Sequence, residues 1–138
     1  MASEDVERIA SRKAIISSYR DLHVWQQAMD LPEMCYRASR NFPKEELYGA
    51  VTQIRRSAAS VPANIAEGNG REGHGEYIQF LGIAQGSLKE LETHILLSQR
   101  VGLIMQQDAD PMLDKAEIVG KMLRALIRSI QKQRQGVA

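Results

Sequence analysis

Ser57-Ala-Ala-Ser-Val-Pro-Ala-Asn-Ile-Ala-Glu-Gly68 is the stretch of sequence that decides the fold. It has the period of an amphipathic helix, but small polar residues run beside its apolar stripe and Pro62 lies near its middle. Polar groups at the edge of a buried helix face need hydrogen-bond partners, and a proline leaves the carbonyl four residues earlier without a donor. The stretch therefore predicts a helix with specific polar neighbours, one of which can donate a hydrogen bond to the Ala58 carbonyl.

The polar residues of this helix predict a seam between two helices. At about 100° per residue they fall within about 60° of one another on a helical wheel. A helix farther along the chain carries a similar stripe, and small residues on both sides would let the two backbones approach closely. The stripe can also be interpreted as a ligand- or RNA-contacting surface, but we favour a buried seam that fixes the register of the two helices. The predicted seam consists of Gln53, Ser57, Ser60, Asn64 and Glu67 on one helix and Ser87, Glu90 and His94 on the other.

The rest of the chain predicts an all-α fold. Apolar residues recur every three or four positions in four segments, and no useful stretch alternates with the period of a strand. Pro43 closes the first helix, Glu45 and Glu46 suit the first turn of the second, Gly102 stops the third, and Asp110-Pro111 begins the fourth. Long helices with short connections indicate an antiparallel up-down-up-down four-helix bundle over residues 21–135, with a mobile N-terminal arm over residues 1–20. The expected buried stripe of the first helix is Trp25, Ala28, Pro32, Cys35, Ser39 and Phe42.

Composition limits the class of protein. The chain has 138 residues, of which 43% are hydrophobic and 25% charged, as in ordinary globular domains, and its formal net charge is +1. The single cysteine, Cys35, excludes an internal disulfide, and its place on an apolar stripe predicts a buried, unreactive thiol. No apolar run is long enough to cross a membrane and the N-terminus does not resemble a signal peptide. We therefore expect a cytoplasmic protein with no membrane partner.

The third helix, expected from about His74 to Val101, predicts self-association. Ile78, Leu96 and Leu97 lie more than about 90° around the wheel from the centre of its main apolar stripe. A helix that is apolar beyond one stripe is buried on more than one side, and in a four-helix bundle only another subunit can cover the second side. These three residues are the predicted interface of an obligate homo-oligomer.

The fourth helix carries a basic stripe. Arg124, Arg128 and Lys132 step by four along one face, while acids concentrate near the start of the helix. Acid at the start and base at the end suit the helix dipole, so a solvated face explains much of the pattern. The alternative is a phosphate-binding surface that an oligomer would multiply, with Arg55 and Arg71 as further nucleic-acid contacts.

Two motifs suggest cofactors, but neither lies in the structural context that its cofactor requires. Gly68-Asn-Gly70-Arg-Glu-Gly73 matches the dinucleotide-binding pattern, but it follows a predicted helix where that pattern requires a strand. Glu90 and His94 share a helical face near Glu67, but the chain has no Glu-x-x-His pair of the di-metal bundles. We predict no cofactor, no metal site, no catalytic residue and no small-molecule substrate.

From Asp21 onward the chain resembles the bacterial four-helix-bundle family of 23S rRNA intervening-sequence proteins, which are relatives of the retroelement accessory variability proteins. The resemblance implies five-fold rings or barrels of identical chains, with a role that is mostly unknown. The retroelement relatives are basic and associate with nucleic acid and a reverse transcriptase. The matching segments are Asp21-Leu22-His-Val-Trp25, Phe42-Pro43-Lys-Glu45-Glu46, Gln53-Ile-Arg-Arg56-Ser57, Ser60-Val-Pro62-Ala-Asn64-Ile-Ala-Glu67-Gly68 and Phe80-Leu81-Gly-Ile-Ala84-Gln-Gly86-Ser87-Leu88-Lys-Glu90-Leu-Glu92.

Taken together, the residues and the resemblance predict a non-enzymatic homo-oligomer, pentameric by the resemblance, that acts as a scaffold or adaptor. A nucleic-acid-binding oligomer that uses the basic surface of the fourth helix is the alternative.

Overall fold

The computed structural model describes residues 18–136, and these residues contain helices and turns but no strand. Four long helices account for most of them. Short helical turns precede the first and second of these helices. The elements are η1 (Tyr19–Asp21), α2 (His23–Ser39), η2 (Lys44–Glu46), η3 (Leu47–Val51), α3 (Thr52–Asn69), α4 (His74–Arg100) and α5 (Gln106–Arg134).

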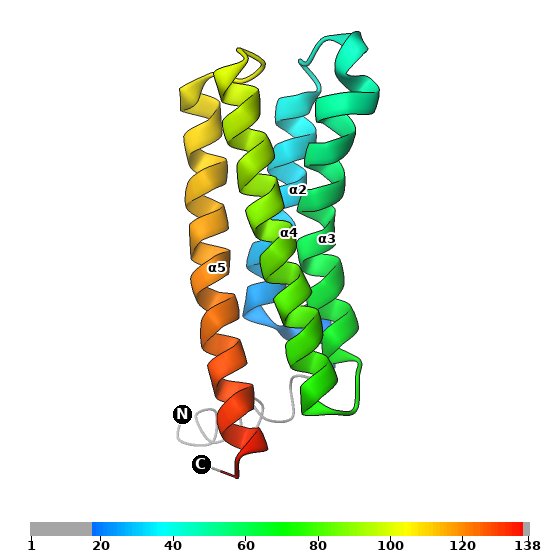
Figure 1. Cartoon of the computed structure of the whole chain (residues 1–138), viewed down its shortest axis with the longest axis vertical. Coiled ribbons are helices and arrows are strands. Elements are labelled where there is room, and N and C mark those ends of the chain that lie inside the picture. Colours follow the sequence, from blue (N-terminus) through cyan, green and yellow to red (C-terminus); the bar gives the residue numbers. More distant parts are fainter. Residues whose placement is uncertain (1–17, 137–138) are drawn as a thin grey trace, which may run out of the picture.

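The long helices lie side by side in alternating directions (Figure 1). Each contacts the next one along the chain, α2 also contacts α5, and the α3–α4 contact is the most extensive. The ends of α2 and α4 therefore lie with the beginnings of α3 and α5 at one end of the bundle, shown at the top of Figure 1. The predicted all-α, four-helix arrangement is confirmed.

A continuous apolar core runs along the bundle axis. Its largest fully buried side chains come from all four long helices, which is what an apolar stripe of period 3.6 on each helix produces. In α2 the stripe differs from the prediction, because Trp25 and Pro32 are only half-buried while Val24 and Leu31 are buried. Trp25 lies at the edge, where the ring of Tyr19 packs against it edge-on at 5.2 Å between centroids.

Two helix starts also differ from the prediction. Instead of a helix that begins at Glu45, the chain forms the η2 turn and the π-helical turn η3. The second long helix, α3, begins only at Thr52. There the Glu46 carboxylate accepts a hydrogen bond from the Ala50 amide at 3.5 Å, which caps this irregular start. The last helix begins at Gln106, so Pro111 lies inside α5 instead of opening it.

The end of α4 matches its prediction. Gly102 has a φ of 82°, a left-handed conformation that glycine adopts without steric cost. Its amide bonds the Gln99 carbonyl at 3.1 Å, and the Leu103 amide bonds the Ser98 carbonyl at 2.8 Å. These bonds satisfy carbonyls at the end of the helix and turn the chain toward α5.

Most of the predicted N-terminal arm, residues 1–17, lies outside the described residues. Residues 18–20 pack at the end of the bundle, where the Ser18 hydroxyl accepts a hydrogen bond from the Arg20 amide at 3.1 Å. None of the described helices is long and apolar enough to cross a membrane.

Candidate functional site

The polar seam brings three of its predicted members into direct contact between α3 and α4. The hydroxyl oxygens of Ser60 and Ser87 lie 2.8 Å apart and share a hydrogen bond across the two helices. Asn64 Nδ2 donates to the Ser60 hydroxyl at 2.9 Å and to the Ser60 carbonyl at 2.7 Å. All three side chains are half-buried, so the bond links the helices at the edge of the core.

Other members of the predicted seam bond within their own helix. The buried Ser57 hydroxyl donates to the Gln53 carbonyl at 2.7 Å and lies 3.2 Å from the Ile54 carbonyl. The Gln53 side chain accepts from Arg56 at 3.0 Å. None of these side chains bonds the Ala58 carbonyl. The seam therefore does not supply the hydrogen-bond donor expected for that carbonyl. Serine hydroxyls on a helix reach the carbonyl three or four residues before them.

The acidic and imidazole groups of the seam lie apart from the serine contact. Glu90 Oε1 lies 3.8 Å from His94 Nε2 and 3.9 Å from an Arg56 nitrogen, and Glu67 pairs instead with Arg71 at 3.0 Å. Within residues 18–136 no three histidine, cysteine or acidic residues are close enough together to hold a metal ion. The Glu67, Glu90 and His94 grouping considered from the sequence is therefore not assembled.

Close backbone approach occurs one turn below the seam. Gly68 is buried in the last turn of α3, and a Cβ at this position would lie 2.7 Å from Phe80 Cβ and 3.1 Å from Tyr77 Cδ1 of α4. The hydroxyl of Tyr77 accepts a hydrogen bond from Asn69 at 3.2 Å beside it. Only glycine fits here, so α3 and α4 are fixed at this end by shape as well as by the seam.

Two of the candidate nucleic-acid residues are engaged within the chain. Arg55 Nε donates to the Ser39 hydroxyl at 2.8 Å, and its guanidinium lies over the Tyr36 ring at 4.4 Å. These contacts join α2 to α3.

Arg71 pairs with two acids, Glu67 at 3.0 Å and Glu76 at 4.0 Å, and also lies over the Phe80 ring at 4.9 Å. Both arginines therefore have structural partners.

The basic stripe on α5 is different. Arg124, Arg128 and Lys132 are exposed, and none has an acidic partner within 4.0 Å among residues 18–136. Lys121 on the same helix is paired with Glu117 at 3.4 Å. The stripe therefore presents three uncompensated charges on one helix face.

The predicted interface residues divide into two groups. Ile78 is half-buried and packs against the core of its own chain. Leu96 and Leu97 remain 50% and 53% exposed. Leu96 borders a groove of about 470 Å³ between α4 and α5, and Leu97 borders one of about 500 Å³ between α3 and α4. Sequence reasoning missed these grooves, because their shape depends on how the helices are spaced.

Cys35 lies in the core, as its position on the apolar stripe predicted. Its thiol is fully buried and its sulfur lies 3.8 Å from the Met112 sulfur. Burial raises the pKa of the Cys35 thiol to about 12, so the thiol is protonated at neutral pH.

Comparison with known proteins identifies the family. The profile of the 23S rRNA-intervening sequence proteins matches residues 20–125. This chain belongs to that family. The match covers η1 through most of α5 and ends before Arg128 and Lys132, so part of the basic stripe lies beyond it.

A solved member of the S23 ribosomal protein family, a protein of unknown function from Bacteroides thetaiotaomicron, has the same fold. The two structures superpose with a TM-score of 0.68 at 22% sequence identity, over 75% of this chain and 97% of that one. A search of functionally curated proteins finds no match. The family and the fold of this 23S rRNA-intervening sequence protein are thus established.

Proposed function

We propose that this 23S rRNA-intervening sequence protein is a non-enzymatic homo-oligomer that serves as a scaffold or adaptor. The observation that carries the proposal is the half exposure of the adjacent Leu96 and Leu97 on α4. Contiguous apolar surface of this kind marks an interaction site, and burying it gains about 25 cal/mol per Å². The family resemblance supports a five-fold ring as the form of the assembly.

The seam hydroxyls and the single thiol are engaged or buried, which favours a structural role. The seam hydroxyls bond one another and helix carbonyls, and Cys35 is buried and protonated. A reactive site needs a nucleophile within reach of an activating base. These observations therefore favour a bundle whose surface binds other chains over one that catalyses a reaction.

Replacing Leu96 and Leu97 with glutamine is expected to weaken the assembly. A fully buried leucine contributes about 1.5–3 kcal/mol, so two half-exposed leucines supply enough for at least a tenfold change in affinity. The measurement is the mass by light scattering over a dilution series. The control is Leu47→Gln, which changes a leucine of similar exposure, 47%, in η3. Equal masses for the two variants at every concentration would show that Leu96 and Leu97 lie outside the interface.

Nucleic-acid binding is the second candidate function, and it is favoured by Arg124, Arg128 and Lys132, which have no acidic partner among residues 18–136. Cations that lack acidic partners are free to neutralise phosphates and release the counterions bound to them. In a homo-oligomer the stripe would be repeated once in each subunit. This gathers more phosphate contacts than a chain with a net charge of +1 could make alone.

The double variant Arg124→Glu, Arg128→Glu is expected to bind single-stranded RNA more weakly and with a smaller salt dependence. Each lost contact to a phosphate of a single strand lowers the slope of log affinity against log salt by about 0.7. The control is Lys121→Glu, which changes a charge already paired with Glu117. If the double variant keeps the wild-type affinity and slope, the stripe is only a solvated helix face.

A further inference from the structure

One half of the α4–α5 face contains no acidic residue. It is the half at the bottom of Figure 1, where α4 begins and α5 ends. Its two segments are residues 77–89 and residues 118–136, which together carry six lysines and arginines and no aspartate or glutamate. They lie side by side, because a Cβ at Gly120 would lie 3.3 Å from Leu88 and a Cβ at Gly75 would lie 3.3 Å from the Arg134 guanidinium. We call this half the basic surface.

Most of the cations on the basic surface have no acidic partner. Lys89 pairs with Glu92 at 2.9 Å and Lys121 with Glu117 at 3.4 Å. The others are exposed and have no acid within 4.0 Å among residues 18–136: Arg124, Arg128, Lys132 and Arg134. At 1.5 Å per residue these four span about 15 Å of α5. The contact of Arg134 with Gly75 therefore extends the basic stripe of α5 to the start of α4.

The aromatic side chains of the basic surface are not available to stack on bases. Tyr77 and Phe80 are the aromatic residues of its two segments. Both are half-buried and lie beside Gly68 of α3. The Tyr77 hydroxyl accepts a hydrogen bond from Asn69, and the Arg71 guanidinium lies over the Phe80 ring. Proteins that hold single strands stack successive bases on aromatic side chains. Attraction to a nucleic acid at this surface therefore depends on its phosphates.

The shape of the basic surface favours an RNA duplex over a DNA duplex. The two helices lie side by side, and α4 has glycine at two exposed positions, Gly82 and Gly86, where a Cβ would have no neighbour within 4 Å. Direct readout of B-DNA requires an element that enters a groove, and neither helix projects from the bundle. The minor groove of A-form RNA is wide and shallow, so a broad basic face can contact phosphates across it.

We infer that the basic surface binds double-stranded RNA through its phosphates, with Arg124, Arg128, Lys132 and Arg134 as the contacts. The inference rests on nucleic-acid binding, the second candidate function, and names the ligand. A duplex brings the phosphates of two strands within reach of these cations, whereas a single strand brings those of one. Phosphate contacts carry no sequence information, so binding is expected to be independent of sequence.

The double variant Lys132→Glu, Arg134→Glu tests the contact. Binding is measured by fluorescence anisotropy with an RNA duplex of about 20 base pairs, with each of its single strands, and with a DNA duplex of the same sequence. We expect the wild-type chain to bind the RNA duplex most tightly. In about 0.1 M salt the double variant is expected to lose at least about tenfold in affinity for that duplex. The slope of log affinity against log salt should fall by about 0.9 for each lost contact.

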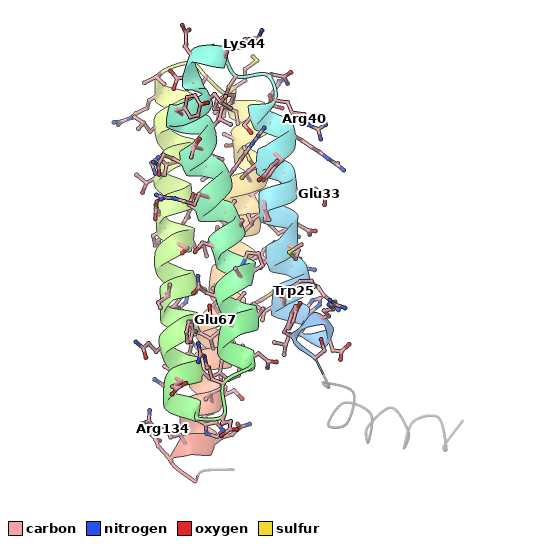
Figure 2. The ribbon with its side chains drawn as sticks, turned by 90° about the vertical axis from the view of Figure 1, so that its right-hand side faces the viewer. Trp25, Glu33, Arg40, Lys44, Glu67 and Arg134 are labelled. Atoms are coloured by element: carbon pink, nitrogen blue, oxygen red, sulfur yellow. The ribbon has the colours of Figure 1, made fainter. Side chains whose placement is uncertain are left out.

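Two control variants separate position and charge from other effects. Arg40→Glu changes an exposed arginine that also has no acid within 4.0 Å among the described residues. Figure 2 shows Arg40 and Arg134 toward opposite ends of the bundle, so this variant is expected to keep the wild-type affinity. Lys132→Arg, Arg134→Lys keeps both charges and is also expected to bind as the wild-type chain does.

The outcomes distinguish the duplex surface from the candidate function on which it rests. Equal affinity for the duplex and its single strands, or a loss in the double variant no greater than in Arg40→Glu, would overturn the duplex surface although the protein still binds nucleic acid. Tighter binding to the DNA duplex would overturn the assignment to RNA. If none of the probes binds even at low salt, nucleic-acid binding itself is wrong, and the duplex surface with it.

Discussion

Gly68→Ala is expected to lower the free energy of unfolding by about 1–3 kcal/mol, the usual cost of overpacking a close contact. The added methyl carbon would lie 2.7 Å from Phe80 Cβ, and a Cβ atom cannot rotate away. The backbones of α3 and α4 must therefore separate where the stretch Ser57–Gly68 ends. The measurement is denaturant unfolding followed by circular dichroism.

Gly82→Ala is the matched control for this prediction. Gly82 also lies inside a helix, but a Cβ there has no neighbour within 4 Å. Alanine in an open helix position gains about 0.5–1 kcal/mol over glycine. If Gly68→Ala lowers the free energy of unfolding and Gly82→Ala raises it, the loss of stability arises at the α3–α4 contact. A loss of stability no greater for Gly68→Ala than for Gly82→Ala would contradict the close approach.

Alkylation of Cys35 by iodoacetamide is expected to be at least about 100-fold slower in the folded chain than in the chain denatured with guanidinium. Burial raises the thiol pKa from 9.0 to about 12, which reduces the reactive thiolate by about a thousandfold near pH 8. The higher intrinsic nucleophilicity of a less acidic thiol offsets part of this decrease. The complete burial of Cys35 then slows the reaction further, because the reagent cannot reach the sulfur.

The expected pH dependence follows from the same shift. Between about pH 8 and 10 the rate in the denatured chain should rise and level off as its thiol ionises near 9.0. The rate in the folded chain should stay low and still be rising, because its thiol ionises near 12. The rates are measured by mass spectrometry of quenched samples. Equal rates in the two states would show that Cys35 is accessible and ionised in the fold.

The sequence predicted the fold because its signals are local and periodic. The apolar stripes defined the long helices, and Gly102 ended α4 in the conformation expected of a C-terminal glycine. The start of α3 was misjudged because the π-helical turn Leu47–Val51 retains a helix-like pattern of apolar residues. The buried residues of α2 were predicted only in part. The predicted and the observed sets of residues both recur every three or four positions, so spacing alone does not choose between them.

The seam was predicted in part for a similar reason. A helical wheel gives the direction of a side chain but not its bonding partner, so it placed Ser60 near Ser87 and also placed Glu67 among them. In the structure Arg71, one turn later on the connection, pairs with Glu67 instead.

The mass of the wild-type chain in solution tests the central claim, self-association, most directly. Light scattering at micromolar concentration is predicted to give a single species at a multiple of 15.5 kDa, and five copies if the ring is the form of the assembly. A mass of 15.5 kDa that does not change with concentration would contradict the claim.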